Sequence, residues 1–163
     1  MASLINSLID ILTEQEGLYK EVTALSLEKK EYIIQNDTEA LRAILEKENS
    51  AVARALRADK ERAGIMDNIA IVLGKEPSDI TLSSIIASLK NQDESEALAN
   101  IAFRIQKAAN EMKMANEDNK VLIESALGYI EYSINAIHSM NDDALLYAGD
   151  DMVEASSILD ING

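Results

Sequence analysis

The residue types that most often carry out chemistry in proteins are scarce and scattered in this sequence. Cysteine is absent, which removes disulfides, thiolate metal sites and thiol nucleophiles. The one histidine, His138, cannot supply the two Glu-x-x-His pairs of a di-iron bundle, and we interpret it as a residue that flanks a helical seam or faces solvent. The glycines Gly64, Gly74 and Gly128 are isolated, and the acids after Lys120 lack the spacing of a calcium loop. We therefore predict no catalytic residues, no metal site and no cofactor, and a protein that is not an enzyme.

Two asparagines, Asn116 and Asn119, are the most informative polar residues. They occupy successive positions of a heptad seam, in which small and apolar residues recur at alternating steps of four and three. In one interpretation they fix register by pairing across helices, as buried asparagine does in coiled coils. In the other, the bundle opens here and the helix beyond presents its seam outward. The seam consists of Leu98, Ala102, Ile105, Ala109, Met112, Asn116, Asn119, Ile123, Ala126, Ile130, Ser133, Ile137 and Met140.

An apolar stripe follows the two asparagines. A stripe of this kind is core by default, and we apply that interpretation to its first half. For its last two turns and the tail we favour a binding surface, because exposed apolar patches bordered by acids mark partner sites, and amphipathic helices bind in such grooves. The candidate partner-binding residues are Leu122, Ile123, Leu127, Ile130, Ile134, Ile137, Tyr147, Ile158 and Leu159.

The charge of the chain argues against two common classes of partner. The 29 acidic residues outnumber 15 basic ones, and a net charge of −14 works against binding nucleic acid or an anionic membrane. The last basic residue is Lys120, and the 43 residues after it carry eight acids. The N-terminus lacks the basic region and cleavage site of a signal peptide, and no apolar run approaches the roughly 18 residues of a membrane span. We predict a cytoplasmic protein without membrane insertion.

Composition predicts an all-α fold, since 47% of the residues are hydrophobic and the chain contains six glycines and one proline. A first helix is predicted from an N-cap at Ser3 to Asn36, and a second from Thr38 to Gly74, forming an antiparallel hairpin. The expected seam of the first helix is Leu4, Leu8, Ile11, Gln15, Leu18, Val22, Leu25, Lys29 and Tyr32. That of the second is Leu41, Ile44, Leu45, Val52, Ala55, Leu56, Arg62, Met66, Ile69 and Leu73.

A short helix and a long third helix are predicted to follow. Ser78 or Asp79 caps the short helix, and the polar stretch Lys90 to Glu96 forms a break. The third helix is expected from about Glu94 to about Met140, roughly 70 Å long at about 1.5 Å per residue, so other helices must support it. We predict an elongated three-helix bundle or coiled coil over residues 1–141. The acidic tail, 142–163, has too little apolar area to fold alone and is a candidate for ordering on a partner.

Several of these residues resemble a known family. The run NEDNKVLIESALGYIEYSI, from Asn116 to Ile134, is similar to the Asn, two spacers, Asn, Leu-Leu and Tyr-Ile stretch of FlgN-type flagellar export chaperones. Tyr147-Ala-Gly149 followed by Ser157-Ile-Leu-Asp160 resembles the Tyr-x-x-Gly and terminal Leu/Phe-Asp pattern of bacterial members. The N-terminal hairpin, the Leu73-Gly74 break and the short Thr81-Leu82 helix fall in the order that the family shows.

This resemblance implies a cytosolic, ATP-independent chaperone for the hook-filament junction proteins, which are the first and third hook-associated proteins. In the family, the C-terminal amphipathic region binds the helical C-terminal segment of the client, prevents premature polymerisation and brings the client to the flagellar type III export apparatus. The stripe from Leu122 to Ile137 is the implied site, and the acids from Asp142 to Asp160 disfavour self-association.

Two other classes of function share these features. In a structural coiled-coil subunit, the stripe pairs with a second copy of the chain, giving a homo-oligomer. In a helical regulatory adaptor, the stripe binds an unrelated helical protein. A solution mass separates the first of these from a chaperone, whereas the adaptor differs from a chaperone only in its partner.

Overall fold

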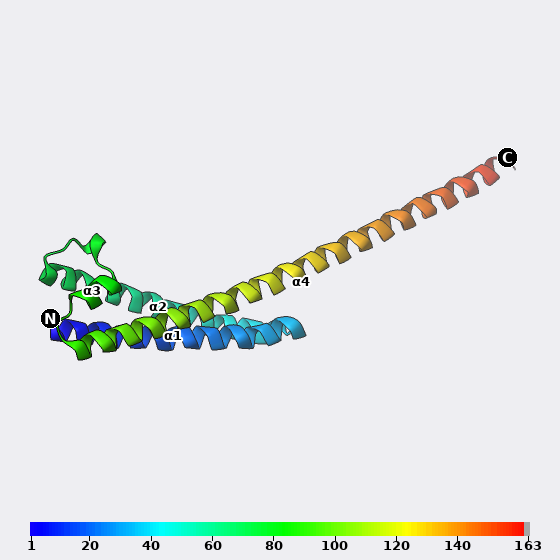
Figure 1. Cartoon of the computed structure of the whole chain (residues 1–163). Coiled ribbons are helices and arrows are strands. Elements are labelled where there is room, and N and C mark those ends of the chain that lie inside the picture. The colour runs from blue at the N-terminus through cyan, green and yellow to red at the C-terminus, as the bar shows by residue number, and fades with distance from the viewer. Residues whose placement is uncertain (162–163) are drawn as a thin grey trace. The chain divides into compact units, whose positions relative to one another are not determined.

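The computed structural model describes the backbone of residues 1–161 and the side chains of residues 1–128 and 131–140. Over this part of the chain the elements are α1 (Ala2–Gln35), α2 (Thr38–Leu73), a 3-10 helix η1 (Pro77–Asp79), α3 (Leu82–Ser88) and α4 (Gln92–Ile161) (Figure 1). The described backbone contains no strand, so the predicted all-α class is confirmed. No helix among the described residues has an apolar stretch that could cross a membrane.

The contacts between residues divide the chain into two units, Met1–Lys120 and Val121–Gly163. The first unit contains α1, α2, η1, α3 and the first part of α4. The second contains the remainder of α4. The separation of an acidic tail at residue 142 stays a prediction.

The hairpin of α1 and α2 has the predicted turn. Asn36 ends α1 in the left-handed conformation, with φ of 55°, which asparagine tolerates better than most residues. The Asp37 carboxylate then caps α2 by accepting a hydrogen bond of 3.0 Å from the main-chain N–H of Ala40. The predicted cap at Ser3 is wrong, because α1 already begins at Ala2 and the Ser3 carbonyl accepts a bond from Ser7.

The segment between α2 and α4 has a different helix cap from the predicted one. Gly74 ends α2 with φ of 64°, as predicted, a conformation that costs glycine little. The predicted cap at Ser78 or Asp79 is wrong, because Pro77 starts a 3-10 turn that includes both residues. Thr81 caps α3 instead, in a reciprocal capping box with Ser84.

The limits of α4 are wider than the periodicity predicted. The helix begins at Gln92, within the stretch taken as a break, because the Asn91 side chain accepts bonds from the N–H groups of Asp93 and Glu94. It also continues beyond Met140 to Ile161. That segment contains no proline, and a single Gly149 in a helix costs only about 1 kcal/mol.

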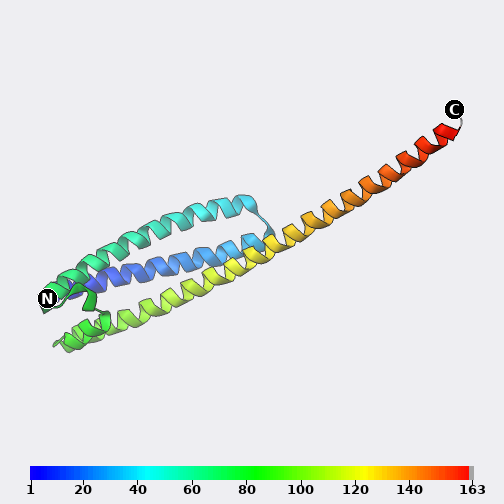
Figure 2. The same ribbon diagram turned by 90° about the horizontal axis from the view of Figure 1, so that it is seen from above.

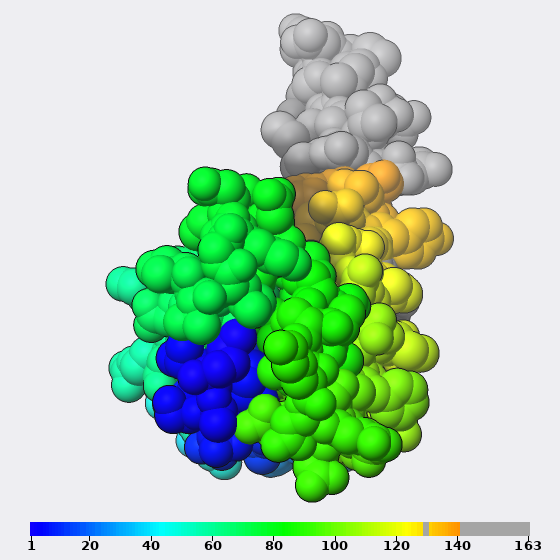
Figure 3. All heavy atoms as spheres, turned by 60° about the vertical axis from the view of Figure 1, so that its left-hand side comes forward, coloured from blue at the N-terminus to red at the C-terminus, as the bar shows by residue number. Residues whose placement is uncertain are grey.

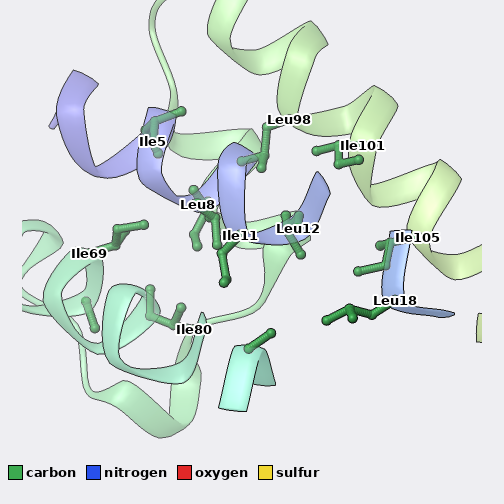
Figure 4. Close-up of a cluster of buried hydrophobic side chains, with 13 residues drawn as sticks. Ile5, Leu8, Ile11, Leu12, Leu18, Ile69, Ile80, Leu98, Ile101 and Ile105 are labelled. Atoms are coloured by element: carbon green, nitrogen blue, oxygen red, sulfur yellow. The ribbon is translucent and has the colours of Figure 1, made fainter. Parts of the chain in front are cut away.

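The hydrophobic core of the first unit lies around the first half of α1. Figure 2 shows α1 between α2 and the early part of α4. In the close-up, Leu8 and Leu12 of α1 lie between Leu98 and Ile101 of α4 on one side and Ile69 of α2 on the other (Figure 4). The segment after α2 adds Ile80 and Ile85 to this cluster, and the space-filling view shows it against the first turns of α1 (Figure 3).

Burial on α2 differs from the predicted seam. Ile44 and Ile69 are buried as predicted, but Leu45, Val52 and Leu56 are exposed. The buried positions include three residues with short or polar side chains: Glu48, Ala51 and Ala58. Alanine at these positions permits close approach of α2 to its neighbour, and the larger side chains then lie along the edge of the contact.

An ion pair joins α1 to α4 beside the core. The carboxylate of Glu16, which is buried, accepts hydrogen bonds from Lys20 at 2.9 Å and from Arg104 at 2.5 Å. The bond from Lys20 and the charge and bonds of Arg104 lower the pKa of Glu16 and outweigh the opposing effect of burial. A second pair, Arg54 with Glu21, links α2 to α1 on the surface, where such pairs contribute little.

We expect Leu98→Ala to lower the free energy of unfolding by about 2–5 kcal/mol, because it removes a fully buried side chain from the core. Urea unfolding followed by circular dichroism measures the change. Leu56→Ala is the matched control, since Leu56 is exposed, and its loss should stay below about 1 kcal/mol. Equal losses in the two variants would contradict the described core.

Glu16 should make stability depend on pH in the acid range. Because its folded pKa lies below the ordinary value of 4.5, its contribution is complete above about pH 4.5 and is lost as the pH falls through the folded pKa. We therefore expect Glu16→Gln to destabilise the protein at neutral pH, with the difference from the wild type shrinking in acid. Urea midpoints measured across the pH range test this. Glu14→Gln, on the exposed side of the same helix, should show no such convergence.

Candidate partner-binding surface

A polar cluster joins three helices at the end of the first unit. Its centre is Ser26 of α1, which is fully buried. The side-chain amide of Asn119 is 3% exposed and donates a hydrogen bond of 2.6 Å to the main-chain oxygen of Ser26. The Ser26 hydroxyl donates to Asn116 Oδ1 at 3.0 Å. Both asparagines therefore bind the same residue of α1, which confirms pairing across helices, although only Asn119 is buried and Asn116 is exposed.

The cluster extends to α2 through Glu48, which is buried. One carboxylate oxygen of Glu48 lies 3.4 Å from the Ser26 hydroxyl, and the other accepts a bond of 2.9 Å from Lys29. A hydroxyl carries one proton, so the shorter contact to Asn116 is the stronger of its two bonds. Glu48 is thus held chiefly by the Lys29 charge, as a buried carboxylate requires. The predicted seams do not include Ser26 and Glu48, because they favour the larger apolar residues nearby, such as Leu25 and Val52.

The buried face of α4 in the first unit agrees with the predicted seam at every second position and differs at the others. The predicted seam contains Ala102, Ala109 and Asn116, but the buried residues are their preceding neighbours, Ile101, Ala108 and Ala115. The buried residues Leu98, Ile101, Ile105, Ala108, Ala115 and Asn119, with the half-buried Met112, are spaced by alternating steps of three and four, whereas Ala102 and Ala109 are half-buried beside them. Small or apolar residues stand on both sides at 101/102 and 108/109, and alanine stands beside asparagine at 115/116, so periodicity alone does not choose between the two registers.

Apart from Leu122, the large aliphatic residues at the start of the second unit do not continue this register. Three residues beyond Asn119 the same spacing reaches Leu122, and then Ala126, Tyr129 and Ser133. The large side chains fall one residue later, and we call them the aliphatic stripe: Ile123, Leu127, Ile130, Ile134 and Ile137. Their spacing of four, three, four and three residues is a new heptad register. The aliphatic stripe therefore has its own heptad phase, and its flanks are set by the residues beside its five members.

The described members of the aliphatic stripe are exposed. Ile123, Leu127, Ile134 and Ile137 are between 42% and 57% exposed. Leu122 is half-buried and follows the register of the first unit. The side chain of Ile130, and the predicted site residues Tyr147, Ile158 and Leu159, lie outside the described side chains. Their part in binding stays a prediction.

The two flanks of the aliphatic stripe differ in charge. One flank carries Glu124, Glu131 and His138, each one residue after an isoleucine of the stripe and each exposed. The other flank carries the uncharged residues Ala126, Ser133 and Met140. No lysine or arginine follows Lys120, so no permanently charged base in the second unit pairs with the two glutamates. The aliphatic stripe thus has an acidic edge and a neutral edge.

A second apolar feature lies wholly in the first unit. Val52 and Leu56, predicted as core, line a groove of about 310 Å³. Tyr19 and Val22 of α1 and Met112 of α4 also line it. The groove also contains Asp59, which accepts a bond from the Arg62 side chain.

Among the described residues, no group of three or more acidic or histidine side chains is placed to hold a metal ion.

These features define an all-helical protein with an exposed apolar stripe on its last helix. The FlgN protein family matches residues 1–153, which is nearly the whole chain, and the chain therefore belongs to this family. FlgN proteins are flagellar export chaperones, so the general role is that of an export chaperone with a protein partner. Comparison with curated proteins and with solved structures finds no match.

We expect Asn119→Ala to lower the free energy of unfolding by about 1–2 kcal/mol, because it removes a buried hydrogen bond to α1. Urea unfolding and hydrogen exchange of the α4 amides measure the loss. Asn110→Ala is the control on the same helix, since Asn110 is exposed and both replacements gain the same helix propensity. A loss no greater than that of the control would contradict the role of the Asn119 bond.

Proposed function

We propose that this protein is a cytoplasmic chaperone of the hook-filament junction proteins, the first and third hook-associated proteins. It binds their helical C-terminal segment, prevents premature polymerisation, and presents the client to the flagellar type III export apparatus. Membership of the FlgN family supports the general role. The exposed aliphatic stripe is the observation that carries the choice of a helical client segment.

The physical basis is the mutual covering of two apolar faces. A segment that forms an inter-subunit coiled coil in the assembled filament exposes its own seam while it is a monomer. Burial of a large aliphatic side chain is favourable by about 1.5–3 kcal/mol when the side chain starts fully exposed, and by proportionally less for Ile123, Leu127, Ile134 and Ile137. Part of this gain is offset by the cost of ordering the client. The resulting affinity is limited, which suits a complex that must dissociate for export.

The acidic tail has a second part in the proposal. We place Tyr147, Ile158 and Leu159 in an extension of the client site, because these apolar residues stand among acids and add to the surface that a long client helix can cover. The acids around them disfavour self-association through like-charge repulsion. Truncation after Asn141 separates this contribution from that of the aliphatic stripe.

We expect Ile134→Asp to weaken binding of the C-terminal segment of a hook-associated protein by roughly thirtyfold, equivalent to about 2 kcal/mol. Calorimetric titration measures the affinity and the negative heat-capacity change that apolar burial produces. Tyr132→Asp is the matched control, since Tyr132 is also exposed but lies off the aliphatic stripe. It should bind nearly as the wild type does.

Two outcomes would contradict the proposed function. Absence of saturable binding to either junction protein would remove the client assignment. A stable oligomer at all concentrations, dissociated by Ile134→Asp, would favour the structural coiled-coil subunit, because the aliphatic stripe would then be covered by a second copy. Sedimentation of the free protein decides between the two functions.

A further inference from the structure

We infer that the occupant of the aliphatic stripe is a helix with basic residues on the flank that faces Glu124 and Glu131. The inference rests on the proposed function, and it adds the chemistry by which one apolar helix is chosen over another. It is carried by the register of the stripe and by the acids at its edge.

The first step concerns where the occupant lies. In the heptad of the aliphatic stripe, Ile123, Ile130 and Ile137 take one core position and Leu127 and Ile134 take the other. This register is offset by one residue from the one that packs α4 against α1 up to Asn119. A helix that docks on the aliphatic stripe therefore follows the second register, whose flanks are set by the residues next to these five.

The second step concerns charge. Residues beside the two core positions of a coiled coil lie close to the partner helix and determine which partners are accepted. Here one flank holds Glu124 and Glu131, which are exposed, and no lysine or arginine lies in residues 121–163 to pair with them. Opposing acids across the contact are unfavourable, whereas lysine or arginine gains attraction.

The third step excludes a second copy as the preferred occupant. In an antiparallel pair of identical stripes, the flank with Glu124, Glu131 and His138 faces its own copy, so its glutamates meet glutamate or the one histidine and no lysine or arginine. In a parallel pair, the same flank faces Ala126, Ser133 and Met140, which offer no positive charge. Neither arrangement satisfies the glutamates, so a basic amphipathic helix fits this surface better than the chain itself.

The test uses two synthetic helical peptides of three heptads, both with leucine at the core positions. One carries lysine at both flanking positions and the other carries glutamate. We expect the lysine peptide to bind the full-length protein roughly tenfold more tightly at low salt, with the difference shrinking at high salt. The double variant Glu124→Lys, Glu131→Lys should reverse the preference.

A control variant separates the local flank from overall charge. Glu61→Lys with Asp67→Lys changes the net charge by the same amount on exposed positions of α2. It should keep most of the preference for the lysine peptide. A similar reversal in this control would overturn the inference, because the preference would then follow net charge alone. Equal affinity of the two peptides for the wild type, absence of binding by both, or binding that survives Ile134→Asp would also overturn it.

Failure of this inference can be distinguished from failure of the proposed function. A hook-associated client that binds through the aliphatic stripe, but with the same affinity for Glu124→Lys, Glu131→Lys, would overturn the inference and leave the function. Conversely, a clear preference for the lysine peptide without binding of either junction protein would support the inference and remove the client assignment.

Discussion

The buried hydrogen bond from the Asn119 amide to the main-chain oxygen of Ser26 is the constraint on which the packing register of α4 depends. An amide taken out of water must find a partner, and here that partner is available only when α4 lies on α1 in one register. The same serine binds Asn116 and contacts Glu48, so the three helices of the first unit are aligned at one level. Aliphatic contacts alone would permit sliding by a heptad, because Leu98 and Ile105 are interchangeable in chemistry.

The residues of α4 differ in size and exposure before and after Asn119. Up to Asn119, α4 buries side chains at positions that are often small, such as Ala108 and Ala115. Beyond Leu122 the large aliphatic residues shift by one position, and Ile123, Leu127, Ile134 and Ile137 are exposed. A change of register with a gain in side-chain size is expected where one helix serves two partners, first its own bundle and then another helix. Under the proposed function, the second helix is that of the client.

The exposed surface also has to remain soluble and available. Ile123, Leu127, Ile134 and Ile137 would promote association if they stood on a neutral helix. Acids on one flank, and the absence of any base after Lys120, oppose pairing of identical stripes while leaving the surface open to a helix of opposite charge. Charge in this chain therefore acts on the choice of partner, while the folded core depends on apolar contacts and a few buried polar bonds.

The sequence by itself determined the fold class and the residues at which the two helices of the hairpin begin and end. Asn36, Asp37 and Gly74 act through local backbone geometry and capping, which depend on neighbours in sequence, and all three were predictable. Family membership was also readable from the stretch after Asn116. The polar residues Lys90 to Glu96 predict a break, but Asn91 caps α4 and the helix begins within this stretch.

Only the tertiary structure decided which face of each helix is buried. Ile101 replaces Ala102, and Glu48 and Ala58 replace Val52 and Leu56, because burial depends on how closely two helices approach and on the bonds available to each polar atom. Apolar residues lie on both sides of the buried seam in the sequence, and periodicity does not distinguish between adjacent positions. Ser26 is the clearest case: its small polar side chain gave no signal in sequence, yet it is the point where three helices meet.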